Sequence, residues 1–312
     1  MTTSSTAARD LDLVVVGGAN TDFLVKGAEL PRAGTTVQGE TFQEAAGGKG
    51  ANQAVAAARL GARVAFVARV GADDRGTRLI ERLAGEGVDT SHVKRHPRAA
   101  SGVALVMVDA GGEKQIMTAP GANRELTVAD VQAAAPWIAR ARVLLVQLEV
   151  PLATVEAALR LARSAGAHTV LDPAPQRPLS SEMLRDVHVI RPNAAEAEAL
   201  TGVEVKDEAS ARKAAENLIE RGAGAAVVAA PGGNLLLSSE VELWVPHIPV
   251  RAVDATGAGD AFAAAFAVAL AEDHSLSSAA RFAGAAAALK TTKLGAQAGL
   301  PTRDEVLALL SA

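Results

Sequence analysis

The chain has 312 residues, of which 49% are hydrophobic and 21% charged, and its formal net charge is -4. This length accommodates one α/β core with a small appended subdomain, and the composition excludes a disordered chain and a basic surface for nucleic acid. The absence of cysteine excludes disulfides, thiolate catalysis and Cys-based metal sites. The polar first ten residues and the interrupted apolar stretches predict neither a signal peptide nor a membrane span, so we expect a cytoplasmic protein.

Short apolar runs alternate with longer helical patterns along the chain. The runs predict strands at 11–17, 63–71, 142–148, 168–172, 186–193 and 225–230. Segments rich in Ala and Leu predict helices at 50–60, 74–85, 153–165, 207–221, 260–272 and 276–290. Continuous apolar strands separated by helices indicate a parallel sheet covered on both faces, and such sheets bind ligands beyond the carboxyl ends of their strands.

Residues 22–46 and 101–121 break this rhythm. Alternating apolar and polar positions, as in 102–108, and turn residues predict antiparallel strands outside the main sheet. These strands form either a small β-lid over the edge of the active site or two ordinary edge hairpins. Since the sequence has no internal repeat or linker, we expect one domain over 1–312 with this β-lid inserted.

The segment RAVDATGAGDAFAAAFAVALAE at 251–272 carries the strongest chemical signal. A strand-like approach ends at Asp254, the small residues Gly257, Ala258 and Gly259 follow, and a helix begins near Asp260. Small residues let a helix start approach a ligand closely, and its free N–H groups and positive dipole end suit a developing phosphoryl charge. Asp260 would accept a proton late in a phosphoryl transfer. The alternative is an Asp that caps a helix after a Gly turn.

A second motif, EAAGGKGANQAVAAARLGA, spans 44–62. Its glycines turn into a helix from which Lys49 and Asn52 project polar groups. Gly50 stands where a Walker A loop needs Ser or Thr, which excludes a P-loop, and the missing dinucleotide fingerprint disfavours an oxidoreductase. Two interpretations remain: a polar cluster at the helix start that binds hydroxyl groups, or a plain helix N-terminus with a solvated lysine.

Further polar residues follow other predicted strands. Asn20 and Asp22 could bind a diol or serve as turn residues. Glu149 ends one strand, and Asn193 and Glu196 follow another. A carboxylate in such a place could order the waters of Mg²⁺, although Glu196 equally suits the N-terminus of a helix.

Together, GGKGAN near residue 50 and GAGD near residue 260 resemble the ribokinase (PfkB carbohydrate kinase) family. The resemblance also covers NTD at 20–22, SGVAL at 101–105, QLEVP at 147–151, LDPAP at 171–175, RPNAAEAEALTG at 191–202 and KLGAQ at 293–297. It implies a Rossmann-like, three-layer α/β fold, in which helices cover both faces of a parallel sheet and a β-lid forms a homodimer contact. It also implies transfer of the γ-phosphoryl group of ATP to O5 of D-ribose, which gives ribose 5-phosphate.

The resemblance assigns roles to individual residues. Asp260 would be the base, beside an anion hole of Gly257, Ala258 and Gly259. The sugar would be held by Asn20, Thr21, Asp22, Gly48, Lys49, Gly50, Ala51, Asn52, Glu149 and Asp260. The nucleotide would contact Asn193, Ala229, Ala230, Pro231, Gly232, Gly233, Asn234, Gly259 and Gly284. Glu196 would organise Mg²⁺ through water, and an activating K⁺ would lie near Asp254, Thr256, Lys290, Lys293, Gly295 and Gly299.

The sequence departs from the family pattern at three places. AAPGGN at 229–234 replaces the usual TxGxxG, so Ala229 lacks a hydroxyl and Pro231 lacks an N–H. Ala255 stands where the family prefers Thr. Lys290 stands where a small apolar residue is usual; its ammonium could crowd or replace K⁺, but we expect it to reach solvent instead.

Two alternatives to a ribose kinase stay open: a kinase for another small sugar or a nucleoside, and a non-catalytic sugar-binding relative. The intact set from Gly257 to Asp260 favours an enzyme, since a pure binder needs no base beside an anion hole. Only Phe23 and Phe42 of the β-lid could stack on a nucleoside base, whereas the polar residues suit a small polyhydroxyl ligand. We therefore predict ribose as the acceptor, with no nucleic acid or membrane partner.

Overall fold

The computed structural model describes residues 9–311. Its main sheet has nine strands in the order β13-β12-β11-β10-β9-β8-β1-β4-β5. These strands are β1 (Leu11–Val16), β4 (Val64–Gly71), β5 (Asp89–His96), β8 (Ala141–Gln147), β9 (His168–Asp172), β10 (Val189–Ile190), β11 (Ala225–Ala230), β12 (Gly233–Ser238) and β13 (Glu242–Pro246). The strands from β5 to β11 in this order are parallel, whereas β12 and β13 pair antiparallel at one edge. The predicted α/β fold is confirmed, with this antiparallel edge as a correction.

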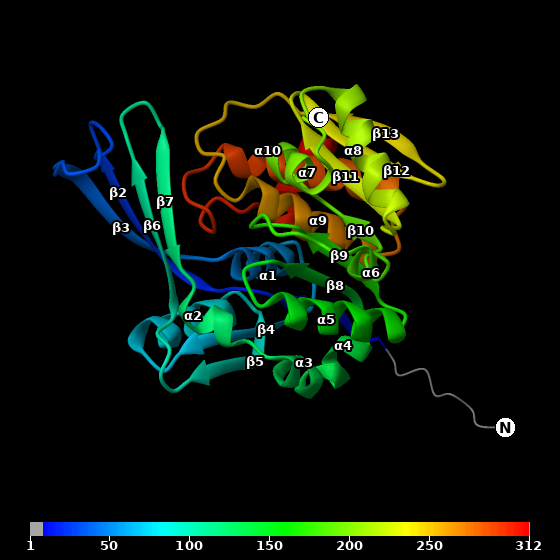
Figure 1. Cartoon of the computed structure of the whole chain (residues 1–312), viewed down its shortest axis with the longest axis horizontal. Helices are drawn as coiled ribbons and strands as arrows, with labels where there is room; N and C mark the ends of the chain where they lie inside the picture. The colour runs from blue at the N-terminus through cyan, green and yellow to red at the C-terminus, as the bar shows by residue number, and fades with distance from the viewer. Residues whose placement is uncertain (1–8, 312) are drawn as a thin grey trace.

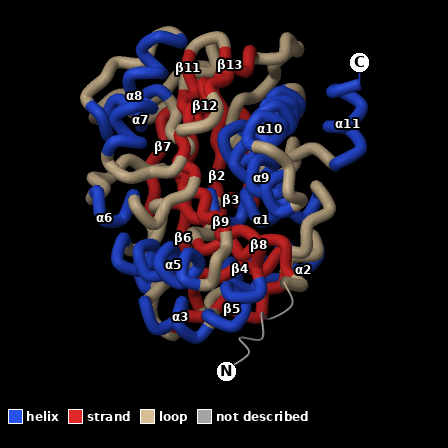
Figure 2. The backbone as a smooth tube through the Cα atoms, turned by 90° about the vertical axis from the view of Figure 1, so that its right-hand side faces the viewer, coloured by secondary structure: helices blue, strands red, loops and turns tan. Residues whose placement is uncertain are grey.

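Helices cover both faces of the main sheet, so that its central strands are buried (Figure 2). One face carries α1 (Lys49–Arg59), α2 (Asp74–Gly85), α9 (Ala258–Ala271), α10 (Leu276–Thr291) and α11 (Arg303–Ser311). The other carries α3 (Val128–Ala133), α4 (Ala135–Arg140), α5 (Leu152–Ser164), α6 (Ser181–Leu184), α7 (Ala194–Thr201) and α8 (Glu208–Glu220). The alanines of α9 are buried between the sheet and α10, because small side chains let these layers approach closely.

A second sheet of four strands projects from the main body (Figure 1). Its order is β3-β2-β6-β7, with β2 at Asn20–Gly27, β3 at Gly39–Gly47, β6 at Gly102–Val108 and β7 at Lys114–Ala119. The segments predicted to leave the main sheet therefore form this second sheet. The expectation that it is wholly antiparallel was wrong, because β2 and β6 pair in parallel. Each of them continues from a parallel strand of the main sheet, β1 or β5, so they run in the same direction.

Some elements differ from the sequence prediction. The residues before Asp254 form no strand; Val253 and Asp254 instead donate their N–H groups to the carbonyl of Thr291 at 2.7 and 3.0 Å. The strand predicted at 186–193 is only Val189–Ile190, and a helix cap follows it. No helix within residues 9–311 is long and apolar enough to cross a bilayer.

Candidate active site

The N-terminus of α9 carries the predicted base. Gly257 caps the helix in the left-handed conformation, with φ at 84°, which glycine adopts without steric cost. Asp260 lies in the first turn and is only 5% exposed. Ala258 donates its N–H to Ala255 at 3.1 Å, whereas no described residue accepts from the N–H of Gly257 or Gly259. The helix start therefore offers free donors beside a buried carboxylate.

Side chains from α1 orient the carboxylate of Asp260. Asn52 Nδ2 donates to Oδ2 at 2.9 Å, and Gln53 Nε2 donates to Oδ1 at 3.1 Å. Lys49 Nζ lies 3.6 Å from Oδ1. These donors hold the carboxylate in one orientation, which a proton acceptor needs.

Lys49 neutralises two buried carboxylates. Its Nζ lies 3.2 Å from Asp172 Oδ2, an atom that also accepts from Gln53 Nε2 at 2.7 Å. Burial alone would lower the pKa of Lys49, but the carboxylates of Asp172 and Asp260 raise it well above its usual range. The interpretation of Lys49 as a solvated lysine was wrong.

Two further carboxylates, those of Glu149 and Asp22, lie near Asp260. Glu149 Oε2 accepts the backbone N–H of Lys49 at 2.7 Å. Burial, with help from the nearby Asp260 and Asp22, raises the pKa of Glu149 to about 7. Burial and the charge of Asp260 raise the pKa of Asp22 to about 6. Both carboxylates thus lie close to other acidic side chains. Hydroxyl groups of a ligand could donate hydrogen bonds to their oxygen atoms.

The turn after β1 packs against the start of α1. A Cβ on Gly48 would lie 2.8 Å from Ala19 Cα, and a Cβ on Gly50 would lie 2.7 Å from Gly17 C. Glycine at both positions therefore permits the close backbone approach. The predicted residues Asn20, Thr21 and Ala51 are buried at this junction, where Asn20 Oδ1 accepts from Asn123 Nδ2 at 2.7 Å.

Two parts of the predicted nucleotide site, Asn193 and the segment AAPGGN, meet at the carboxyl ends of β10 and β11. Asn193 caps α7 through Glu196 N at 2.9 Å, and Glu196 Oε2 accepts from Asn193 N at 2.8 Å. Glu196 therefore does serve as a helix-terminal residue, and its role at Mg²⁺ stays a prediction. Ala229 N donates to the carbonyl of Pro192 at 3.0 Å, which brings the start of AAPGGN beside Asn193.

AAPGGN itself forms a tight hairpin between β11 and β12. Pro231 and Gly232 are its turn residues, and Gly232 has φ at 87°, as a Pro-Gly type II turn requires. Ala230 pairs with Gly233, and Ala229 with Asn234. Gly284 lies in α10, where a Cβ would be 3.5 Å from Val245 Cγ1 of β13.

Several residues predicted to hold K⁺ lie close together, and the ammonium group of Lys290 lies among them. Lys290 is fully buried, and its Nζ donates to the carbonyl oxygens of Asp254 at 2.9 Å and Lys293 at 3.1 Å. The expectation that Lys290 reaches solvent was wrong, because these acceptors lie within reach of its packed side chain. Gly295 N donates to Asp254 Oδ2 at 3.0 Å, and Gly299 N to the carbonyl of Gly295 at 3.0 Å.

Sequence reasoning missed several polar residues of the site. Asp172 ends β9 within the LDPAP segment, and Gln53 directly follows Asn52; strand-end position and helix register were the available signals. Arg191 lies beside the predicted anion hole, since a Cβ on Gly259 would be 2.8 Å from its Nη1. Its guanidinium carbon lies 4.9 Å from the ring centre of Phe262. The Arg191 side chain thus adds a cation where phosphoryl charge would develop.

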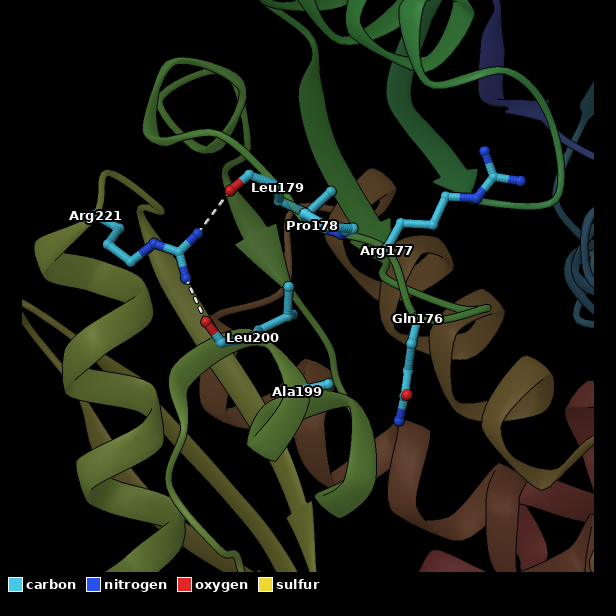
Figure 3. Close-up of a pocket in the computed structure, with 7 residues that line it drawn as sticks. All are labelled: Gln176, Arg177, Pro178, Leu179, Ala199, Leu200 and Arg221. Atoms are coloured by element: carbon cyan, nitrogen blue, oxygen red, sulfur yellow. Dashed lines mark hydrogen bonds between the residues drawn. The ribbon is translucent and has the colours of Figure 1, made fainter.

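A hollow of about 360 Å³ is lined by residues 176–179, by Ala199 and Leu200 of α7, and by Arg221 (Figure 3). Arg221 joins its two sides by donating to the carbonyl oxygens of Leu200 at 2.6 Å and Leu179 at 2.7 Å. None of the predicted site residues lines it.

Known proteins resemble this chain over nearly its whole length. Residues 10–303 match the family described as pfkB family carbohydrate kinase. The chain belongs to this family. The kinase is 42% identical over 299 residues to the ribokinase of Haemophilus influenzae, covering 96% of this chain and 98% of that protein. It is 40% identical over 300 residues to the ribokinase of Bacillus subtilis, and the match covers 96% of this chain and 99% of that protein.

The fold of this kinase is also similar to that of solved ribokinases. The structure of Arabidopsis thaliana ribokinase complexed with ribose and ATP matches with a TM-score of 0.88 and 33% identity, covering 97% of this chain and 99% of that one. The ribokinase of Thermotoga maritima matches with a TM-score of 0.87 and 35% identity, covering 97% and 100%. The predicted membership of the family is confirmed, and the chain is a sugar kinase.

Proposed function

We propose that this kinase transfers the γ-phosphoryl group of ATP to the O5 hydroxyl of D-ribose, which gives ribose 5-phosphate and ADP. The observation that carries the proposal is the buried carboxylate of Asp260, fixed between a polar cluster and the free N–H groups of α9. The Arabidopsis relative complexed with ribose and ATP supports this acceptor and donor. A non-catalytic sugar binder would not need a base at that position.

Asp260 acts as the catalytic base. As the bond between O5 and the γ-phosphorus forms, the bond from that phosphorus to the β-phosphate oxygen breaks, and the O5 proton passes to the carboxylate. A weak base suffices, because the transition state is loose and the alcohol loses its proton late. The N–H groups of Gly257 and Gly259, the dipole of α9 and the guanidinium of Arg191 stabilise the charge on the transferring group.

The sugar hydroxyls bind to the polar residues around Asp260. Asn20 and Asp22 lie at the start of β2, while Lys49, Asn52 and Glu149 come from the main body. The second sheet covers this site as a lid, since β2 carries the sugar-side residues and continues into it. Closure of such a lid excludes water and so limits ATP hydrolysis.

Mg²⁺ accompanies ATP in the proposed reaction. Among residues 9–311, no three His, Cys, Asp or Glu side chains converge on one metal position, so the ion is held chiefly by the phosphates. Glu196 and Asp172 supply oxygen atoms that suit hydrated Mg²⁺, and Asp172 Oδ1 is buried with no hydrogen-bond partner. The ion would neutralise phosphate charge and orient the γ-phosphoryl group. K⁺ is not part of the proposal, because the ammonium of Lys290 stands among the oxygens that would bind it.

The outer face of the second sheet forms a homodimer contact. Strand register places Phe23, Leu105 and Met117 across from one another on one face, with Val25 and Phe42 beside them. Met117 is 70% exposed and Phe42 65% exposed. An apolar sheet face that is this exposed fits burial against a second copy. The cytosol is the proposed compartment, since ATP is the co-substrate and none of the 312 residues is Cys.

An ADP-release panel tests the proposed function. Ribose, 2-deoxyribose, fructose and adenosine are supplied separately with ATP and Mg²⁺, and kcat/KM is compared. We expect the highest kcat/KM with ribose and a phosphorylated product at O5. A higher kcat/KM with another acceptor would identify that acceptor, and not ribose, as the substrate. Sugar binding without ADP release would instead favour the interpretation as a non-catalytic sugar-binding relative.

A further inference from the structure

A buried ammonium lies behind the loop that leads into the anion hole. The Lys290 side chain is fully inaccessible, although lysine is seldom completely buried unless it is paired. Its Nζ donates to two backbone carbonyls, of Asp254 at 2.9 Å and Lys293 at 3.1 Å, and lies 3.9 Å from Asp254 Oδ2. Two carbonyl oxygens and a carboxylate therefore surround a positive charge.

These acceptors are of the kind that bind a dehydrated monovalent cation. Backbone carbonyls replace the water shell of such an ion, and a nearby carboxylate balances its charge. The Lys290 side chain already occupies the space between them. A Cβ on Gly299 would lie 3.1 Å from Lys290 Cε and 3.0 Å from the carbonyls of Gly295 and Lys293, so the surroundings are closely packed. The residues present therefore fit an ammonium group in place of K⁺.

The same contacts reach the loop at 254–257, which leads into α9. Asp254 lies in a segment with no helix or strand, three residues before the helix cap Gly257. Its carboxylate accepts from Gly295 N at 3.0 Å and from Thr256 N at 3.0 Å. Burial opposes ionisation, yet these bonds and a contact with Lys114 hold the pKa of Asp254 well below its usual range. Asp254 thus joins α10 and the 293–299 segment to the start of α9.

The charge of Lys290 responds to the same neighbours. Burial lowers the pKa of Lys290, while the carboxylate of Asp254 opposes that shift. The ammonium of Lys114, from β7 of the second sheet, lies 3.1 Å from the other carboxylate oxygen of Asp254, Oδ1. Asp254 is therefore balanced by two cations, of which Lys290 alone is shielded from solvent salt.

We propose that the ammonium of Lys290 acts as a built-in cation that positions residues 254–257, so that this kinase needs no K⁺ or other monovalent ion. Lys290 is a positioning residue, since it acts through the loop and not on the substrates. The activity readout of this proposal rests on the proposed ribose phosphorylation. The effect of monovalent cations on the melting temperature can be measured whether or not the protein phosphorylates ribose.

The first test uses the wild-type protein in tetramethylammonium chloride, with K⁺ added at constant ionic strength. We expect kcat for ribose phosphorylation to change by less than about 2-fold, and the melting temperature to stay constant. Activation of 5-fold or more by K⁺, or a saturable rise in melting temperature specific to K⁺, would overturn the proposal. If no ADP forms in any salt, the proposed function fails, while the melting temperatures still decide the role of Lys290.

Two substitutions separate the charge from the packing. Lys290→Ala removes the side chain and opens space among the carbonyls, so we expect a loss in kcat of at least about 10-fold that K⁺ partly restores. K⁺ should also raise the melting temperature of this variant. Lys290→Met fills the space without charge, so its kcat should be low and insensitive to K⁺. Wild-type turnover by Lys290→Met, or no K⁺ response in a folded Lys290→Ala, would contradict the proposal; where a variant does not fold, the wild-type titration decides.

Discussion

Asn52 and Asp260 lie 208 residues apart in the sequence, yet Asn52 Nδ2 donates to Asp260 Oδ2 at 2.9 Å. This bond joins the first turn of α1 to the first turn of α9 and sets the direction in which the carboxylate accepts a proton. A hydrogen bond to a charged group contributes about 1.5–3 kcal/mol. The contact is therefore large enough to affect turnover.

We predict that Asn52→Ala lowers kcat by about 10- to 100-fold, because the carboxylate loses its fixed orientation. Steady-state ADP release and circular dichroism measure turnover and fold. In a double-mutant cycle, Asn52→Ala should add little to the loss already caused by Asp260→Asn. Fully additive losses would mean that Asn52 acts on the sugar and not through Asp260.

The stability of the sugar-free enzyme should fall as pH rises from 5 to 8. Glu149 has a pKa of about 7 in the folded chain against an ordinary value of 4.5, so the folded state holds the proton more tightly than the unfolded state. Its contribution is complete below the unfolded pKa and is lost as pH rises through the folded pKa. Asp22, at about 6 against 3.8, acts in the same direction.

Urea unfolding at several pH values measures this effect. We expect Glu149 to contribute a fall in the free energy of unfolding on the order of 1–3 kcal/mol between pH 5 and 8. Glu149→Gln cannot titrate, so its profile should be flatter than that of the wild type. An identical slope in both proteins would show that Glu149 ionises normally.

The outer face of the second sheet should control oligomeric state. We predict that the double variant Phe42→Lys and Met117→Lys is a monomer by light scattering, because charges would be buried at the contact. Leu307→Lys, which changes an exposed apolar residue of α11, is the matched control and should leave the dimer intact. A monomeric wild type, or a double variant that stays dimeric, would show that this face does not form a dimer contact.

Local pattern predicted much of the architecture. The strand at 225–230 and the helix at 74–85 match β11 and α2 to the residue, because their apolar spacing and flanking turns are unambiguous. By contrast, β5 reads DTSHVKRH, and its polar residues conceal a strand at the edge of the sheet. The parallel pairing of β2 with β6 depends on chain direction in three dimensions, which no local pattern carries.

The site was predictable only where a motif held it together. GGKGAN and GAGD indicated Lys49, Asn52 and Asp260, but not that Asp172 would pair with Lys49 across 123 residues. The burial of the Lys290 ammonium could not be predicted from the sequence either. A lysine side chain can reach solvent or bury its ammonium, and the carbonyls that decide between these belong to Asp254 and Lys293.

The kinetics of Asp260→Asn test the central claim most directly. Asparagine keeps the size and hydrogen-bonding reach of the side chain but cannot accept the proton. We predict at least a ~10²-fold lower kcat, with ribose affinity close to that of the wild type by calorimetry. Asp273→Asn, just beyond the other end of α9, is the matched control and should turn over normally. Near-normal turnover by Asp260→Asn would contradict the assignment of Asp260 as the base.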